Sequence, residues 1–137
     1  MITLQEYFGH WWDHHDATEE RKANAERLLG LCEKLELMAL ADGVEFPINP
    51  TTGSGVSGST YGGFRPQSCP IGAPSSSHKE GLAVDRYDPS GQIDEWCMAH
   101  QDDLKECGIY IEHPKYTVGW SHWTIRPPKS GNRVFIP

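Results

Sequence analysis

Apolar residues recur at three- and four-residue steps through one long segment in the first third of the chain. The segment runs from about residue 18 to residue 40, and its apolar positions are Ala25, Leu28, Leu29, Cys32, Leu35 and Met38–Ala39. Such spacing places these positions on one face of a helix, so the pattern predicts a long amphipathic helix. Asp16 or Thr18 can cap its start, and the Asp42–Gly43 pair can end it.

A shorter helix is predicted over residues 3–9, where Thr3 precedes Glu6 at the spacing of a capping box. The two helices are separated by the polar stretch His10–Asp16, which is rich in histidine and aspartate. This stretch resembles a metal-binding cluster. Its position at the entry to a helix favours the interpretation that its side chains are exposed to solvent.

The second half of the chain alternates short strand patterns with one more helical pattern. The strand patterns occupy 81–88, 109–112 and 120–125, and the helical pattern occupies 92–106. Because strand residues alternate between faces, His122 should face away from Ser121 and Trp123. The segment 47–77, rich in Gly, Ser, Thr and Pro, predicts a loop, and loops of this length in a compact domain are commonly functional.

Composition limits the classes of partner. The chain of 137 residues fits one domain, spanning 1–137, and carries a formal net charge of −7. An acidic chain is a poor candidate for binding nucleic acid. The sequence also lacks the cluster of basic residues that would predict stable membrane association. The four cysteines form no C-x-x-C pair, so mostly reduced thiols are expected. The first residues lack the pattern of a signal peptide, so cytoplasmic synthesis is expected.

Candidate metal ligands stand at both ends of the segment His78–Asp85. Imidazole nitrogens and carboxylate oxygens both bind zinc, and a turn followed by a short strand can direct both side chains into one pocket. Gly81 permits a tight backbone path between them, and Ala83 leaves room on the strand face of Asp85. Such pairs also arise by chance, and a solvated His78 with Asp85 as a cap is an equal alternative.

A third candidate ligand, His122, lies far along the chain between Trp120 and Trp123. Three protein ligands that leave one position open are typical of catalytic zinc sites. The alternative is a core histidine packed among aromatic side chains. Convergence of His122 with His78 and Asp85 in space would decide between the two interpretations.

These residues belong to motifs that resemble a known family. Ser76–Asp85 has the form S-x-H-x-x-G-x-A-x-D, and Trp120–His122 has the form W-x-H. Together with Gly63–Pro66, they resemble the zinc D-alanyl-D-alanine carboxypeptidase and dipeptidase family, which includes bacteriophage endolysins and has a hedgehog-like fold. The resemblance, over about residues 56–125, implies an α+β fold. In that fold a small antiparallel sheet holds the zinc, and the N-terminal and middle helices pack outside it.

The same resemblance assigns roles to individual side chains. The residues that it assigns to Zn²⁺ are His78, Asp85 and His122. Arg65 would polarise the scissile carbonyl and stabilise the oxyanion, and Ser76 would contact the substrate. Trp120 is a candidate to line the same pocket, with packing in the core as its alternative.

One departure from the family pattern concerns the general base. The family usually places a glutamate three residues before the last ligand, where this chain has Gly119. The nearest acidic residue is Glu112, at the end of the preceding predicted strand, and His113 follows it. We therefore predict Glu112 as the base and His113 as the second choice, while a surface carboxylate is the alternative for Glu112.

The resemblance implies a zinc metallopeptidase, encoded by a phage, that cuts peptidoglycan stem peptides next to a D-amino acid, and we expect it to be a monomer. It would act on the bacterial cell wall after release from the cell, or as part of a virion. A catalytically silent, zinc-stabilised virion or cell-wall-binding module is the alternative that Gly119 motivates. A metal-free structural protein is the third interpretation.

Overall fold

Four helices and four short strands make up the structure, a computed structural model that describes residues 1–137. The helices are α1 (Leu4–Phe8), α2 (Glu19–Ala41), α3 (Gln92–Ala99) and α4 (Gln101–Cys107). The strands are β1 (Ala83–Tyr87), β2 (Tyr110–Glu112), β3 (Trp120–Thr124) and β4 (Val134–Phe135). The predicted α+β class is therefore confirmed.

The strands form one sheet in the order β1-β3-β2-β4. Strand β3 pairs antiparallel with β1 and with β2, whereas β4 pairs parallel with β2. The expectation of an antiparallel sheet is correct for the first three strands and wrong for β4, so the sheet is mixed. The cause is the chain path, because the chain reverses direction once after β3 and then reaches the far edge of β2.

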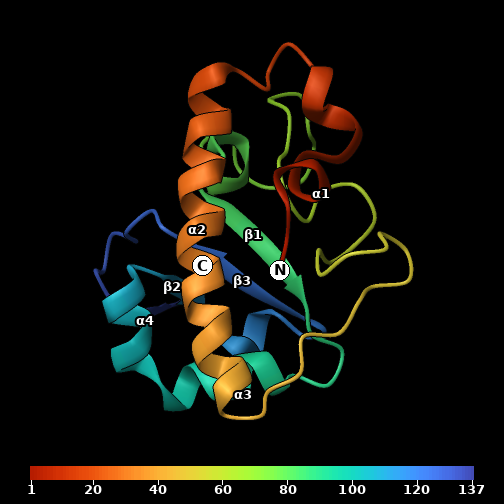
Figure 1. The fold of residues 1–137 in the computed structure, drawn as a ribbon. Helices are drawn as coiled ribbons and strands as arrows, with labels where there is room; N and C mark the ends of the chain where they lie inside the picture. Colours follow the sequence, from red (N-terminus) through yellow and green to blue (C-terminus); the bar gives the residue numbers. More distant parts are fainter.

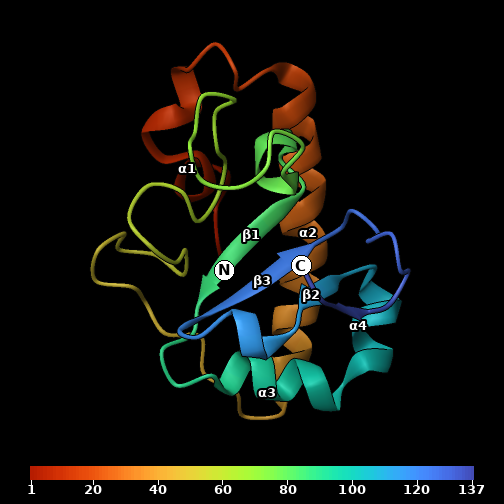
Figure 2. The ribbon, with the colours of Figure 1, turned by 180° about the vertical axis from the view of Figure 1, so that it is seen from behind.

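Helix α2 lies along one face of the sheet, and Figure 2 shows the sheet from its other face (Figures 1 and 2). Trp123 of β3 is fully buried, and Arg86 of β1 pairs with Glu36 of α2. Since neighbouring strand residues point to opposite faces, Asp85 and His122 point away from α2. The face away from α2 therefore carries two of the predicted ligands.

Local sequence signals determine where the first helices begin. Thr3 and Glu6 form the predicted capping box of α1, each side chain accepting the backbone N–H of the other. Of the two candidate caps for α2, Thr18 is the one used, since its side chain accepts the N–H of Arg21. The predicted apolar face of α2 is buried. None of the helices has both the length and the apolar character needed to cross a membrane.

The helix predicted over 92–106 is divided into α3 and α4. The division falls at His100, whose backbone leaves the helical region at φ −129° and ψ 46°. Nδ1 of His100 lies 2.8 Å from the carbonyl oxygen of Trp96, and the two rings stack. All four cysteines are buried and free, as expected for reduced thiols.

The core between α2 and the sheet encloses an ion pair. The carboxylate of Glu36 pairs with the guanidinium of Arg86, and its second oxygen lies 3.2 Å from the N-terminal nitrogen of Met1. The side chains of Glu36 and Arg86 are each only 3 % exposed. The guanidinium also lies over the rings of Phe46 and Trp123. This pair ties α2 to β1, the strand that carries the predicted carboxylate ligand.

Loss of Glu36 should destabilise the fold strongly, because it leaves the charge of Arg86 buried without its acidic partner. Glu36→Ala is expected to lower the free energy of unfolding by about 3–5 kcal/mol, measured by urea denaturation. Glu26→Ala, at an exposed position of the same helix, should change it by less than about 0.5 kcal/mol. Similar small effects of both substitutions would show that the buried pair contributes little.

Candidate metal centre

The side chains of His78, Asp85 and His122 converge on the sheet face away from α2. Asp85 and His122 are direct partners in the register of β1 and β3. His78 reaches the same point from the 3₁₀ turn Ser77–Glu80, just before β1. The structure therefore brings together the three residues that the sequence predicts as ligands, and this buried group could hold a metal ion.

The three ligand atoms form a small triangle. Nε2 of His78 lies 3.3 Å from Nδ1 of His122 and 3.3 Å from Oδ1 of Asp85. Nδ1 of His122 lies 2.8 Å from the same carboxylate oxygen. Bonds of the length that zinc makes to nitrogen and oxygen, at tetrahedral angles, separate ligand atoms by about 3.3–3.6 Å. Two edges of the triangle match this spacing, so the donor set and its size fit such an ion.

Neighbouring groups orient two of these ligands. Nδ1 of His78 lies 2.8 Å from the carbonyl oxygen of Gly63 and donates its proton there, so Nε2 presents a lone pair to the centre. Oδ2 of Asp85 accepts a hydrogen bond from Nη2 of Arg65 at 3.3 Å. The other oxygen, Oδ1, then faces the two imidazoles. A supporting layer of this kind is typical of metal sites.

The turn that carries His78 depends on two small residues. Oγ of Ser76 accepts the backbone N–H of His78 at 3.3 Å and caps the turn. Gly81 ends the turn in the left-handed region at φ +75°, where a Cβ would lie 2.4 Å from the carbonyl oxygen of Arg21 in α2. Only glycine allows this close approach, which is a second constraint beside the tight backbone path expected between His78 and Asp85. The turn is therefore fixed against α2.

Glu112 stands beside His122 on the side opposite to Asp85. In the antiparallel register of β2 and β3, Ile111 faces Trp123, and the next step of that register brings Glu112 opposite His122. Residues that oppose each other in a sheet share a face. The strand order β1-β3-β2 thus places a ligand carboxylate, a ligand imidazole and a further carboxylate in one row.

A cavity of about 480 Å³ opens beside the triad. The other predicted site residues that line it are Arg65, Ser76, Glu112 and Trp120. Six further residues line it without being predicted site residues, namely Gly72, Ala73, Ser75, Ser77, Phe135 and Pro137. The ring of Phe135 meets that of His122 edge to face at 6.0 Å. No local pattern reveals Phe135, because its place depends on the return of the tail to β2.

His113, the second choice as base, lies apart from this cavity. It lines a different cavity, together with Asp94 and Thr117, and its Nδ1 accepts the backbone N–H of Lys115. Glu112 and His113 are adjacent in the chain but line different cavities. The geometry therefore favours Glu112 over His113 as the base.

Burial and charge set the protonation of the site. Burial lowers the pKa of His78, although Asp85 opposes the change. Burial also favours the neutral form of Asp85, but His78 and His122 outweigh it and hold the pKa of Asp85 well below its usual range. Neutral imidazole and ionised carboxylate are the forms that bind a metal ion. Burial raises the pKa of Glu112, which brings this carboxylate closer to the range of an effective general base.

A second group of possible ligands, His14, His15 and Asp16, lies before α2. Nδ1 of His14 accepts the backbone N–H of Asp16 at 3.0 Å, and the carboxylate of Asp16 accepts that of Gln67 at 2.9 Å. The side chain of His15 is 86 % exposed. These contacts give His14 and Asp16 a role in loop structure, and both are partly buried, so within this group the solvent-exposed interpretation is correct for His15 alone.

Comparisons of the chain with protein-family models, with curated proteins and with solved structures found no match. The residues and geometry of the site itself are therefore what indicates its function.

Proposed function

We propose that the protein is a zinc-dependent peptidase that hydrolyses peptidoglycan stem peptides next to a D-amino acid. The observation that carries this proposal is the convergence of His78, Asp85 and His122 at a cavity that also contains Arg65 and Glu112. Three metal ligands beside a carboxylate and a guanidinium are the groups that metal-assisted hydrolysis of an amide requires. The motif resemblance supports the choice of zinc, of peptidoglycan and of a hedgehog-like fold.

Each residue at the cavity has a distinct part in this reaction. When bound to the triad, zinc supplies a Lewis acid that brings the pKa of a water molecule toward neutrality. Glu112 takes the proton of the attacking water on its carboxylate and delivers it to the leaving amine. The side chain of Arg65 is held by two hydrogen bonds, which Nε donates to the carbonyl oxygen of Tyr61 and Nη2 donates to Asp85. Its Nη1 can therefore donate to the oxyanion.

Ser76 and Trp120 would contact the peptide on either side of the scissile bond. Both line the metal cavity, and Trp120 also lines a neighbouring cavity together with Tyr61 and Ile71. An indole and an isoleucine side chain offer an apolar surface to small side chains such as that of alanine. The enzyme would meet this substrate in the cell wall, after release from the cell or as part of a virion.

Turnover on a defined substrate tests the proposal. Purified protein supplied with zinc should release D-alanine, or cleave a stem peptide, when it is incubated with peptidoglycan fragments. A chelator should abolish the activity, and added zinc should restore it. Full activity in protein shown by elemental analysis to be free of metal would refute a zinc-dependent mechanism.

A zinc-stabilised module without catalysis is the second candidate, and Gly119 is the observation that favours it. Gly119 occupies the position of the family's usual glutamate and adopts φ +92°. Other residue types are strained in this conformation, so the position is poorly suited to a catalytic side chain. This candidate predicts one bound zinc ion and no hydrolysis of any stem peptide, whereas hydrolysis that Glu112→Gln abolishes would exclude it.

A further inference from the structure

Two further cavities lie in sequence beside the metal cavity. The middle cavity, of about 240 Å³, shares Arg65, Asp85 and Trp120 with the metal cavity. It shares Ser59 and Gly62 with the far cavity, of about 560 Å³. The shared walls show that the three cavities adjoin one another, and together they are called the groove. The groove leads from the metal centre to the N-terminal segment, so a ligand could extend well beyond the reacting bond.

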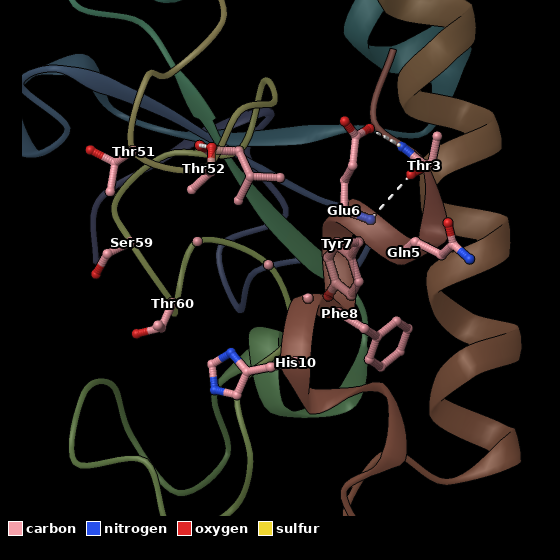
Figure 3. A pocket seen from close by; sticks show the side chains of 14 residues that line it. Thr3, Gln5, Glu6, Tyr7, Phe8, His10, Thr51, Thr52, Ser59 and Thr60 are labelled. Carbon is pink, nitrogen blue, oxygen red and sulfur yellow. Dashed lines mark hydrogen bonds between the residues drawn. The ribbon is translucent and has the colours of Figure 1, made fainter.

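The far cavity lies between α1 with its following turn and the loop 51–60 (Figure 3). The N-terminal segment supplies Glu6 and His10, and the loop supplies Ser59 and Thr60. The side chains of Glu6, His10, Ser59 and Thr60 are all exposed, and apart from the Glu6 oxygen that accepts the N–H of Thr3 their polar groups are available to a ligand. The lining is therefore mainly polar and includes hydroxyl, carboxylate and imidazole groups.

Tertiary contacts hold the loop wall of the far cavity in place. Nε1 of Trp11 donates to the carbonyl oxygen of Thr60 at 3.0 Å, and the indole stacks on the ring of Tyr61. Gly63 packs so closely on α1 that a Cβ would lie 2.0 Å from the carbonyl oxygen of Tyr7. A wall fixed by these contacts gives a preformed cavity, and a ligand loses little affinity to ordering the loop.

The chemistry of this lining suits a sugar. Hydroxyl, carboxylate and imidazole groups can each exchange hydrogen bonds with sugar hydroxyls and amides. The ring of His10 lines the far cavity and that of Tyr61 lines the middle cavity, and both offer flat, amphipathic surfaces. A phosphate backbone is disfavoured, because Glu6 lines the cavity and the net charge of the chain is −7.

We propose that the far cavity binds the sugar chain to which the stem peptide is attached, while the metal centre holds the peptide. This inference rests on the proposed function and specifies its substrate as peptide still linked to glycan. The middle cavity, which contacts both, would hold the connection between sugar and peptide. The enzyme then recognises its substrate by two chemically different parts.

Binding of glycan without peptide tests the sugar site directly. Peptide-free glycan strands prepared from peptidoglycan should bind the wild-type protein in isothermal titration calorimetry. Thr60→Tyr adds a ring at the cavity wall and should weaken this binding about tenfold or more. Ser68→Tyr, at an exposed position outside the three cavities, should leave it unchanged. Absence of binding to the wild type, or equal binding to Thr60→Tyr, would overturn the proposal.

Rates of hydrolysis of two substrates distinguish the role of the sugar site from that of the metal centre. Thr60→Tyr should lower kcat/KM for glycan-linked stem peptide about tenfold and leave kcat/KM for free stem peptide unchanged. A loss of equal size on both substrates, or on neither, contradicts a sugar subsite. If the wild type hydrolyses neither substrate, the proposed function is refuted, and the binding measurement alone decides whether the cavity takes sugar.

Discussion

Glu112→Gln is expected to lower kcat on a stem-peptide substrate by about 10²–10⁴-fold while one zinc ion remains bound. Glutamine keeps the shape of the side chain but cannot accept the proton of the attacking water. The three predicted ligands do not include Glu112, so the metal content should not change. Steady-state kinetics and elemental analysis on the same protein sample measure the two quantities together.

Two further variants show whether the effect is specific to Glu112. Glu106→Gln changes an exposed carboxylate on α4 and should leave kcat near that of the wild type. His113→Ala should also have a small effect, because His113 lines a cavity that the metal ligands do not reach. If His113→Ala abolished turnover and Glu112→Gln did not, the assignment of the base to Glu112 would be wrong.

The row of side chains across the sheet explains how a chain with Gly119 could keep a general base. In the family pattern the base and the last ligand come from one segment, three residues apart. Here the neighbouring strand β2 brings Glu112 beside His122 through the strand register. Sequence alone gives Glu112 as the nearest acidic residue, but only the pairing of β2 with β3 shows that it shares a cavity with the ligands.

Local signals in the sequence predict the parts of the fold that depend on short-range physics. The capping box at Thr3 and Glu6 depends on contacts three residues apart, and the structure contains it. Strand alternation correctly separates His122 from Ser121 and Trp123, because the period of a strand is a local property. The motifs single out His78, Asp85 and His122 as candidate ligands, and the register of β1 and β3 makes Asp85 and His122 meet.

Residues whose partners lie far along the chain were not predictable in the same way. Glu36 looks like an exposed helix residue until its contact with Arg86, fifty positions away, is known. Lys79 reads as solvated by residue type, yet it is buried and its Nζ donates to the carbonyl oxygens of Gln67 and Cys69. Both cases depend on acceptors or charges that the tertiary fold supplies, so no window of local sequence contains the information.

His122→Ala is expected to abolish stoichiometric zinc binding and, with it, turnover. Of the three candidate ligands, His122 can be removed with least damage to the fold, because its side chain is 14 % exposed on the face of the sheet away from α2. The side chain of His78, in contrast, is only 3 % exposed, and its Nδ1 donates a hydrogen bond to the carbonyl oxygen of Gly63. The loss of one of three ligands leaves an incomplete site, and elemental analysis after dialysis should find little zinc.

Thermal unfolding gives a readout of the same site that is independent of activity. Zinc that binds only the folded state should stabilise the wild type by about 4 kcal/mol at a concentration a thousand times its Kd. For a domain of this size that corresponds to a rise in Tm of about 10 °C. His122→Ala should show almost none of this rise, whereas His15→Ala, at the exposed residue of the second group, should show all of it. An unchanged zinc content and Tm shift in His122→Ala would mean that the metal is held elsewhere, and the triad would no longer support a catalytic centre.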